Sequence, residues 1–119
     1  MKLDDLEIYR MCLELSKQAW NIYQHLHWQI KKIIGDQWIT AIDSIGANIA
    51  EGFGRFHFLD KNKFNYNARG SLLESQYWTT VLCQRNIING KEKDSLIHQL
   101  ENLHHKLNNY INSTKDQIT

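Results

Sequence analysis

Residues 89–110 read NGKEKDSLIHQLENLHHKLNNY, and this stretch determines the class of fold that we expect. Its apolar residues recur at alternating spacings of four and three, which places them along one side of an α-helix. They are Leu96, Leu100, Leu103, Leu107 and Tyr110. Asn89 and Glu92 stand three apart just before them, the spacing of a capping box at a helix N-terminus. The stretch therefore predicts an amphipathic helix that needs other helices to cover its apolar side.

Three further segments show helical periodicity, and none alternates long enough to be a strand. The helices are expected near 4–27, 30–52, 60–86 and 90–113. Asp4 and Glu7 are spaced as a capping box for the first helix, and Asp60 is the expected cap of the third. Gly52 or Gly54 is expected to end the second helix in the left-handed conformation. Because the links are short, neighbouring helices should run antiparallel, so residues 1–119 are predicted to form one all-α domain, an up-down-up-down four-helix bundle.

Two of these helices have apolar residues on two sides. On the helix near 60–86, one side holds Phe64, Ala68, Ser71, Ser75, Trp78 and Leu82, and the nearly opposite side holds Tyr66, Gly70, Leu73, Tyr77 and Val81. On the helix near 4–27, Leu6, Leu13 and Trp20 lie opposite Ile8, Leu15, Ala19, Ile22 and Leu26. A helix in a four-helix monomer buries only one side, and large exposed apolar patches are uncommon on monomers. We therefore expect a homo-oligomer, with a monomer that exposes some tyrosines as the alternative.

The composition sets limits on the class of protein. The 119 residues carry a formal charge of +1 and include no proline, whereas dedicated nucleic-acid binders are usually basic. No apolar run approaches the roughly 18 to 20 residues that cross a bilayer, and the first ten residues do not resemble a signal peptide, so a cytoplasmic protein without a membrane partner is expected. Cys12 and Cys83 could pair, but two cysteines in such a chain favour reduced, buried thiols.

The stretch SIGANIAEGFGR, residues 44–55, could be a phosphate loop or a crowded helix. His57 stands where a GxGxxG fingerprint needs its third glycine, and no strand precedes the stretch, which argues against a phosphate loop. A mid-helix glycine such as Gly46 costs roughly 1 kcal/mol relative to alanine, so a close helix approach is expected there. Asn48 lies at the edge of the apolar side and needs a hydrogen-bond partner if it is buried.

Charged residues surround the same stretch. Glu51 and Arg55 are four apart, in the acid-then-base order that favours an ion pair on a helix. Arg69 and Glu74, on the next expected helix, are other candidate partners. The sequence leaves open which of these pairs forms.

These residues resemble a known family, the small bacterial four-helix-bundle proteins encoded within intervening sequences of 23S ribosomal RNA genes. The family pattern is Ser-Ile-Pro-x-Asn-Ile-Ala-Glu-Gly-x-Gly-Arg, followed by a phenylalanine and by Ala-x-Gly-Ser-x-x-Glu. The matching positions here are Ser44, Ile45, Asn48, Ile49, Ala50, Glu51, Gly52, Gly54, Arg55, Phe64, Ala68, Gly70, Ser71 and Glu74. Gly46 replaces the usual proline, and Asn65 and Asn67 replace positions that are usually apolar.

The resemblance implies a homo-oligomeric ring, typically of five subunits, and it assigns no activity. The related accessory proteins of diversity-generating retroelements bind nucleic acid and a reverse transcriptase through basic surfaces. The near-neutral charge of this chain weakens that inference.

Candidate nucleic-acid contacts are the basic residues on both sides of the motif, with phenylalanines between them. They are Lys31, Lys32, Arg55, Lys61, Lys63 and Arg69, interleaved with Phe53, Phe56 and Phe58. Cations hold phosphates and aromatic rings stack on bases. The alternative is a solvated helix end whose phenylalanines are packed in the core or an interface.

The sequence offers no catalytic or metal-binding pattern. The spacings of His25, His27, His98, His104 and His105 place neighbours on different helix sides and match no zinc motif. Glu51 and Glu74 could meet across two helices, but the Glu-x-x-His motif of iron-binding bundles is absent. We therefore expect no catalytic residue and no cofactor. The predicted function is an oligomeric binding or scaffold protein for RNA or a nucleic-acid-processing protein, with a protein adaptor that binds no nucleic acid as the alternative.

Overall fold

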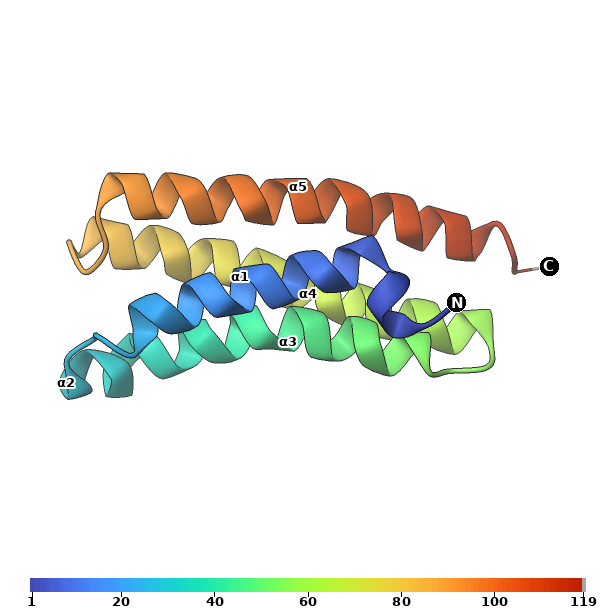
Figure 1. The fold of residues 1–119 in the computed structure, drawn as a ribbon, viewed down its shortest axis with the longest axis horizontal. Coiled ribbons are helices and arrows are strands. Elements are labelled where there is room, and N and C mark those ends of the chain that lie inside the picture. Colours follow the sequence, from blue (N-terminus) through green and yellow to red (C-terminus); the bar gives the residue numbers. More distant parts are fainter. Residues whose placement is uncertain (119) are drawn as a thin grey trace.

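The computed structural model describes residues 1–118, and the regular secondary structure in that range is entirely helical (Figure 1). Within it the four long helices are α1 (Glu7–Tyr23), α3 (Asp36–Phe53), α4 (Phe58–Gln84) and α5 (Gly90–Lys115). The shorter elements are a 3-10 turn, η1 (Leu3–Asp5), the single turn α2 (Trp28–Ile30) and a π-helical segment, η2 (Lys31–Gly35). The predicted all-α class is confirmed.

The long helices lie along the longest axis of a molecule that measures 49 × 22 × 21 Å. In Figure 1 the colour gradient reverses direction from each long helix to the next. Helices α1 and α4 each pack against α3 and α5, so α1 and α4 occupy opposite corners of the molecule.

Helix α5 follows the expected pattern. Its buried side contains Leu96, Leu100, Leu103 and Leu107, as predicted, and continues to Ile111, whereas Tyr110 is half-buried. Its N-terminus has the predicted capping box. The Glu92 amide donates to Asn89 Oδ1 at 2.7 Å, and the Asn89 amide donates to Glu92 Oε1 at 3.0 Å.

The predicted starts of two other helices are wrong. Asp4 does not cap α1, because the acidic residues form the separate turn η1, and the residue before α1 is Leu6 in an extended conformation. The Lys2 amide donates to Asp5 Oδ2 at 2.9 Å, which holds that turn. Asp60 does not cap α4 either, because the helix begins two residues earlier at Phe58 and places Asp60 in its first turn.

The expected glycine end of α3 is also wrong in its geometry. The helix ends at Phe53, and Gly54 follows with a right-handed φ of −76°, so no left-handed glycine closes the helix. In the described range the residue with positive φ is Asn86, at 57°, just after α4. Asparagine tolerates this conformation better than most residues.

The buried side of α4 differs from the predicted one because it is partly polar. Asn62, Asn65, Leu72 and Thr79 are buried although they belong to neither predicted apolar side, whereas Phe64, Ser71 and Trp78 are only half-buried. These polar groups are satisfied inside the protein. Trp38 Nε1 donates to Thr79 Oγ1 at 3.0 Å, and Asn62 Nδ2 donates to the Ile111 carbonyl at 3.0 Å.

Candidate interaction surfaces

The small residues of the 44–55 motif allow neighbouring helices to approach α3 closely. A Cβ atom added at Gly46 would lie 3.0 Å from Cys12 Cβ of α1. One added at Gly52 would lie 3.0 Å from both the Lys61 carbonyl oxygen and Phe64 Cβ of α4. Close helix approach, the expected reason for Gly46, therefore applies at both positions.

The polar residues of the motif interact with residues four positions away in the chain. Asn48 is half-buried, and its Nδ2 donates to the Ser44 carbonyl at 2.8 Å. Arg55 Nη2 lies 2.7 Å from Glu51 Oε1 in an exposed pair, a geometry worth roughly 0.3–0.5 kcal/mol. The Arg55 guanidinium also lies over the Phe64 ring, 4.7 Å from its centroid.

The candidate partners on α4 are occupied elsewhere. Arg69 Nη1 donates to Asn108 Oδ1 of α5 at 3.0 Å, and Glu74 accepts from Trp78 Nε1 at 3.0 Å. Glu51 thus pairs with Arg55 rather than Arg69, and the two carboxylates that could have met across helices each have a partner four residues further along the chain.

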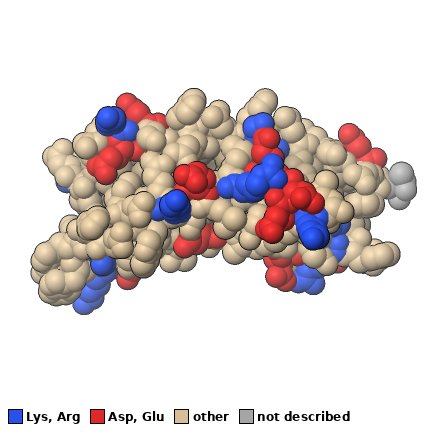
Figure 2. Space-filling view, in the orientation of Figure 1, with Lys and Arg blue, Asp and Glu red and all other residues tan. Residues whose placement is uncertain are grey.

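The candidate nucleic-acid contacts do not form one patch. Lys31 and Lys32 belong to η2, before α3, whereas Arg55, Lys61 and Lys63 follow it. The 18 residues of α3 separate these groups by about 27 Å. Lys61 Nζ also donates to the Phe53 carbonyl at 3.0 Å. Figure 2 shows basic and acidic residues interleaved on the face in view, without a broad basic field.

The outer side of α4, which we define by Tyr66, Gly70, Leu73 and Tyr77, is exposed along its length. The exposed fractions are 41% for Tyr66, 49% for Leu73 and 61% for Tyr77. Gly70 lies between them, and apart from its chain neighbours and the adjacent backbone of its own helix, no heavy atom lies within 4 Å of the position that its Cβ would occupy. Val81 differs from its predicted group because it is half-buried and packs against the core.

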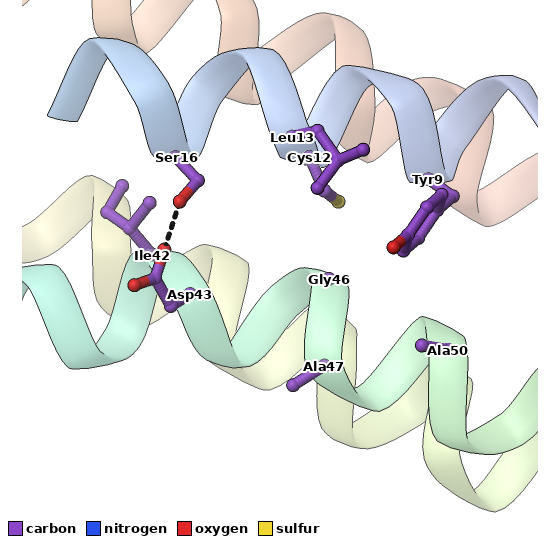
Figure 3. Close-up of a pocket in the computed structure, with 9 residues that line it drawn as sticks. All are labelled: Tyr9, Cys12, Leu13, Ser16, Ile42, Asp43, Gly46, Ala47 and Ala50. Atoms are coloured by element: carbon purple, nitrogen blue, oxygen red, sulfur yellow. Dashed lines mark hydrogen bonds between the residues drawn. The ribbon is translucent and has the colours of Figure 1, made fainter. Parts of the chain in front are cut away.

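A shallow groove runs between α1 and α3 on another side of the molecule (Figure 3). It has a volume of about 250 Å³ and is lined by Tyr9, Cys12, Leu13, Ser16, Ile42, Asp43, Gly46, Ala47 and Ala50. At one end Ser16 Oγ donates to Asp43 Oδ1 at 2.5 Å. Burial raises the pKa of the Cys12 thiol to about 12, so the thiol stays protonated at neutral pH. The groove is suited to receive apolar side chains.

A weak signal for this groove is present in the sequence. Asp43, Gly46, Ala47 and Ala50 recur at helical spacing, so their small side chains leave a shallow strip along α3. Gly46, Ala47 and Ala50 predict a close contact with another helix, but their spacing does not show that part of the strip remains open.

Among residues 1–118, no group of three or more His, Cys, Asp or Glu side chains is arranged to hold a metal ion. Within the same residues, no helix combines the length and the apolar character that crossing a membrane requires.

Together, the long helices and the outward-facing apolar surfaces define an all-helical bundle protein with candidate surfaces for binding other macromolecules. The chain belongs to the 23S rRNA-intervening sequence protein family, whose family model matches residues 4–109. The family resemblance inferred from the motif is thereby confirmed, while the relation to retroelement accessory proteins stays a prediction.

One solved structure supports the fold. The chain is similar to a protein of unknown function from the S23 ribosomal protein family of Bacteroides thetaiotaomicron VPI-5482, with a TM-score of 0.82 and 23% sequence identity. The match covers 87% of this chain and 97% of that chain. No curated protein matches this sequence.

Proposed function

We propose that this protein is a non-catalytic, cytoplasmic scaffold: an antiparallel up-down-up-down four-helix bundle that associates with copies of itself. A closed ring, of five copies as the family resemblance implies, is the proposed assembly. The observation that carries the proposal is the exposed outer side of α4, where three large side chains are 41–61% exposed.

Burial of this side offers a substantial gain in free energy. Fully burying a large apolar side chain contributes roughly 1.5–3 kcal/mol, so covering Tyr66, Leu73 and Tyr77 favours association. Leu13 and Trp20 of α1 are also half-exposed, at 53% and 52%. Two helices at opposite corners of the bundle thus expose apolar side chains, as expected of a subunit with a neighbour on each side.

The experiment is size-exclusion chromatography with light scattering at low salt, recording absorbance at 260 and 280 nm. The proposal expects a mass that is a multiple of the 14.1 kDa subunit. A protein that remains at the subunit mass across the accessible concentration range would overturn it.

A second candidate function is binding of single-stranded RNA at the turn between α3 and α4. Phe56 is 89% exposed there, beside Arg55, Lys61 and Lys63. An exposed aromatic ring among cations can stack on a base while the cations contact phosphates. In an oligomer the site is repeated, so avidity strengthens weak individual contacts. Without this activity the protein would be an adaptor for protein partners.

The RNA proposal has a matched control within the chain. Replacing Lys61 and Lys63 by glutamate should abolish binding to a labelled single-stranded RNA, and affinity for the unmodified protein should fall steeply with added salt. Replacing Lys31 and Lys32, which lie at the other end of α3, changes the charge equally but should leave binding almost unchanged. Equal losses in both variants would show only a general charge effect and refute the site.

A further inference from the structure

We propose that the outer side of α4 in one copy packs against the exposed edge of α1 and the adjoining α1–α3 groove of the next copy, with Leu13 of that copy lying over Gly70. This inference rests on the proposed self-association and specifies which surfaces of the chain meet. It follows from three observations: the open space at Gly70, the levels of residues along the bundle, and the charges beside the two surfaces.

Gly70 lacks an explanation within its own chain. Gly46 and Gly52 are crowded by neighbouring helices, because a Cβ added at either position would lie 3.0 Å from atoms of those helices. At Gly70 an added Cβ would meet only open space. A glycine in a helix interior weakens that helix, and this one lies between the exposed side chains of Tyr66 and Leu73. It forms a gap in an otherwise bulky row. A projecting side chain from another subunit would fit that gap.

The intramolecular contacts show which residues share a level along the long axis. Trp38 of α3 contacts Thr79 of α4, and Gly52 lies against Lys61. Gly70 lies midway between those two α4 residues, and Ile45 lies midway between the two α3 residues, so Gly70 is level with Ile45, about 1.5 Å along the axis from Gly46.

Contacts between α3 and α1 show in the same way which of their residues lie at the same position along the long axis. Gly46 lies against Cys12, so Leu13 is at the level of Gly70. Ser16 bonds to Asp43, and Tyr23 donates to Asp36. Trp20, which lies between Ser16 and Tyr23 in the chain, is therefore near the level of Tyr77.

Rotation about an axis parallel to the bundle does not change the position of a residue along that axis. In a ring built around such an axis, each residue meets residues of the next copy at its own level. The half-exposed Leu13 then meets the gap at Gly70, and Tyr66 meets the small residues Ala47 and Ala50 of the groove. The fit is that of large side chains from one helix against gaps and small residues of another.

The charges beside the two surfaces are complementary at one shared level. Glu74, on the edge of the outer side of α4, is at the level of residues 42–43 of α3 and hence of Lys17, which follows Ser16. Both side chains belong to exposed residues, and neither has an ion-pair partner among residues 1–118. The proposed contact brings Glu74 of one copy close to Lys17 of the next.

The direction in which the exposed α1 surface faces is compatible with a closed ring of subunits. Leu13 lines the groove with α3, and Trp20 stacks on Tyr23, whose hydroxyl donates to Asp36 of α3. The α1 surface therefore faces partly toward α3 rather than straight away from α4. Successive copies turn relative to one another, which allows a ring instead of a straight filament.

Disulfide crosslinking tests the register. A variant carrying both Leu13→Cys and Gly70→Cys should form, under mild oxidation, a ladder of covalent oligomers up to the mass seen by light scattering. The two positions lie on helices at opposite corners of the bundle, so a bond within one chain is not expected. The wild-type protein, with buried Cys12 and half-buried Cys83, gives the background level.

The single variants and a charge exchange complete the test. Covalent dimers from Gly70→Cys alone would indicate that α4 meets α4 about a two-fold axis and would overturn the inference. At low salt, Lys17→Glu and Glu74→Lys should each weaken association about tenfold, and the double variant should restore it.

Light scattering of the wild-type protein separates the two possible failures. An oligomer that forms no ladder in the double-cysteine variant, and whose two charge variants keep the wild-type mass, refutes this register but leaves the proposed function intact. A wild-type protein at the subunit mass refutes the proposed function and this inference with it.

Discussion

Replacing Asn62 and Asn65 by leucine, singly and together, should show that this buried pair acts as a unit. Their exposed fractions are 3% and 1%. Asn65 Nδ2 donates to Asn62 Oδ1 at 3.0 Å, and Asn62 Nδ2 donates to the Ile111 carbonyl at 3.0 Å. The pair therefore connects α4 to α5 through groups that cannot reach water.

The magnitude follows from the group that each change leaves without a partner. Asn62→Leu removes both hydrogen bonds and leaves the Asn65 amide buried and unpaired, which costs about 1–3 kcal/mol. Asn65→Leu leaves Asn62 bound to Ile111 and should cost about 1–2 kcal/mol. The double leucine variant removes both polar side chains and adds apolar contacts, so its unfolding free energy should be close to that of the wild type.

Urea unfolding followed by far-ultraviolet circular dichroism measures these differences. Protein concentration must be fixed, because the proposed self-association would raise the apparent stability. Asn67→Leu is the matched control, since Asn67 is exposed on the same helix and should change stability by less than about 0.5 kcal/mol. If the cost of the double variant equals the sum of the single costs within about 0.5 kcal/mol, the two residues are independent and the reasoning is refuted.

Three further outcomes are expected from other parts of the structure. Gly52→Ala should lower the unfolding free energy by about 1–2 kcal/mol in urea titrations. The added methyl group meets the Phe64 Cβ and a backbone carbonyl at 3.0 Å, and this crowding exceeds the gain in helix propensity. A stabilised variant would contradict this prediction. Burial raises the pKa of Cys12 to about 12, so its thiol should resist alkylation at pH 8 in the native protein and react after denaturation, as measured by mass spectrometry. Rapid labelling of the native protein would contradict the burial of this thiol. Asn89→Ala should lower the melting temperature at a cost of about 1 kcal/mol, because it removes the capping bond to the Glu92 amide; an unchanged melting temperature would show that the cap contributes nothing.

The sequence predicted α5 well and α4 poorly, for a physical reason. In α5, leucines at spacings of four and three form the buried side, so apolar periodicity and burial coincide. In α4, the buried side includes Asn62, Asn65 and Thr79, which the sequence placed on neither apolar side. The Thr79 hydroxyl donates to the Ser75 carbonyl one turn earlier at 2.7 Å. Polar residues satisfied inside the protein look like surface residues in a hydropathy pattern. The large side chains outside the core then have the stronger periodic signal.

The surface residues were harder to place because their contacts depend on the three-dimensional arrangement. Six basic residues near one motif suggested a common patch, but Lys31 and Lys32 precede α3 and Lys61 and Lys63 follow it. Residues at the two ends of a long helix cannot share a ligand of a few nucleotides. By contrast, the Glu51–Arg55 pair, one of the pairs that the sequence left open, does form at the end of α3. Residues four apart lie on the same side of a helix, and Arg55 follows the last residue of α3 by only two positions.

For the glycines within helices, the sequence predicts that a close neighbour exists, and the structure identifies that neighbour. A glycine within a helix predicts a close neighbour, since its cost needs a compensating contact, but the sequence does not say which segment supplies it. The structure assigns that neighbour within the chain for Gly46 and for Gly52. Gly70 is equally unfavourable for its helix and has open space where the neighbour should be. The same physical argument that explains the fold at two glycines therefore supports, at the third, the proposed contact with another subunit.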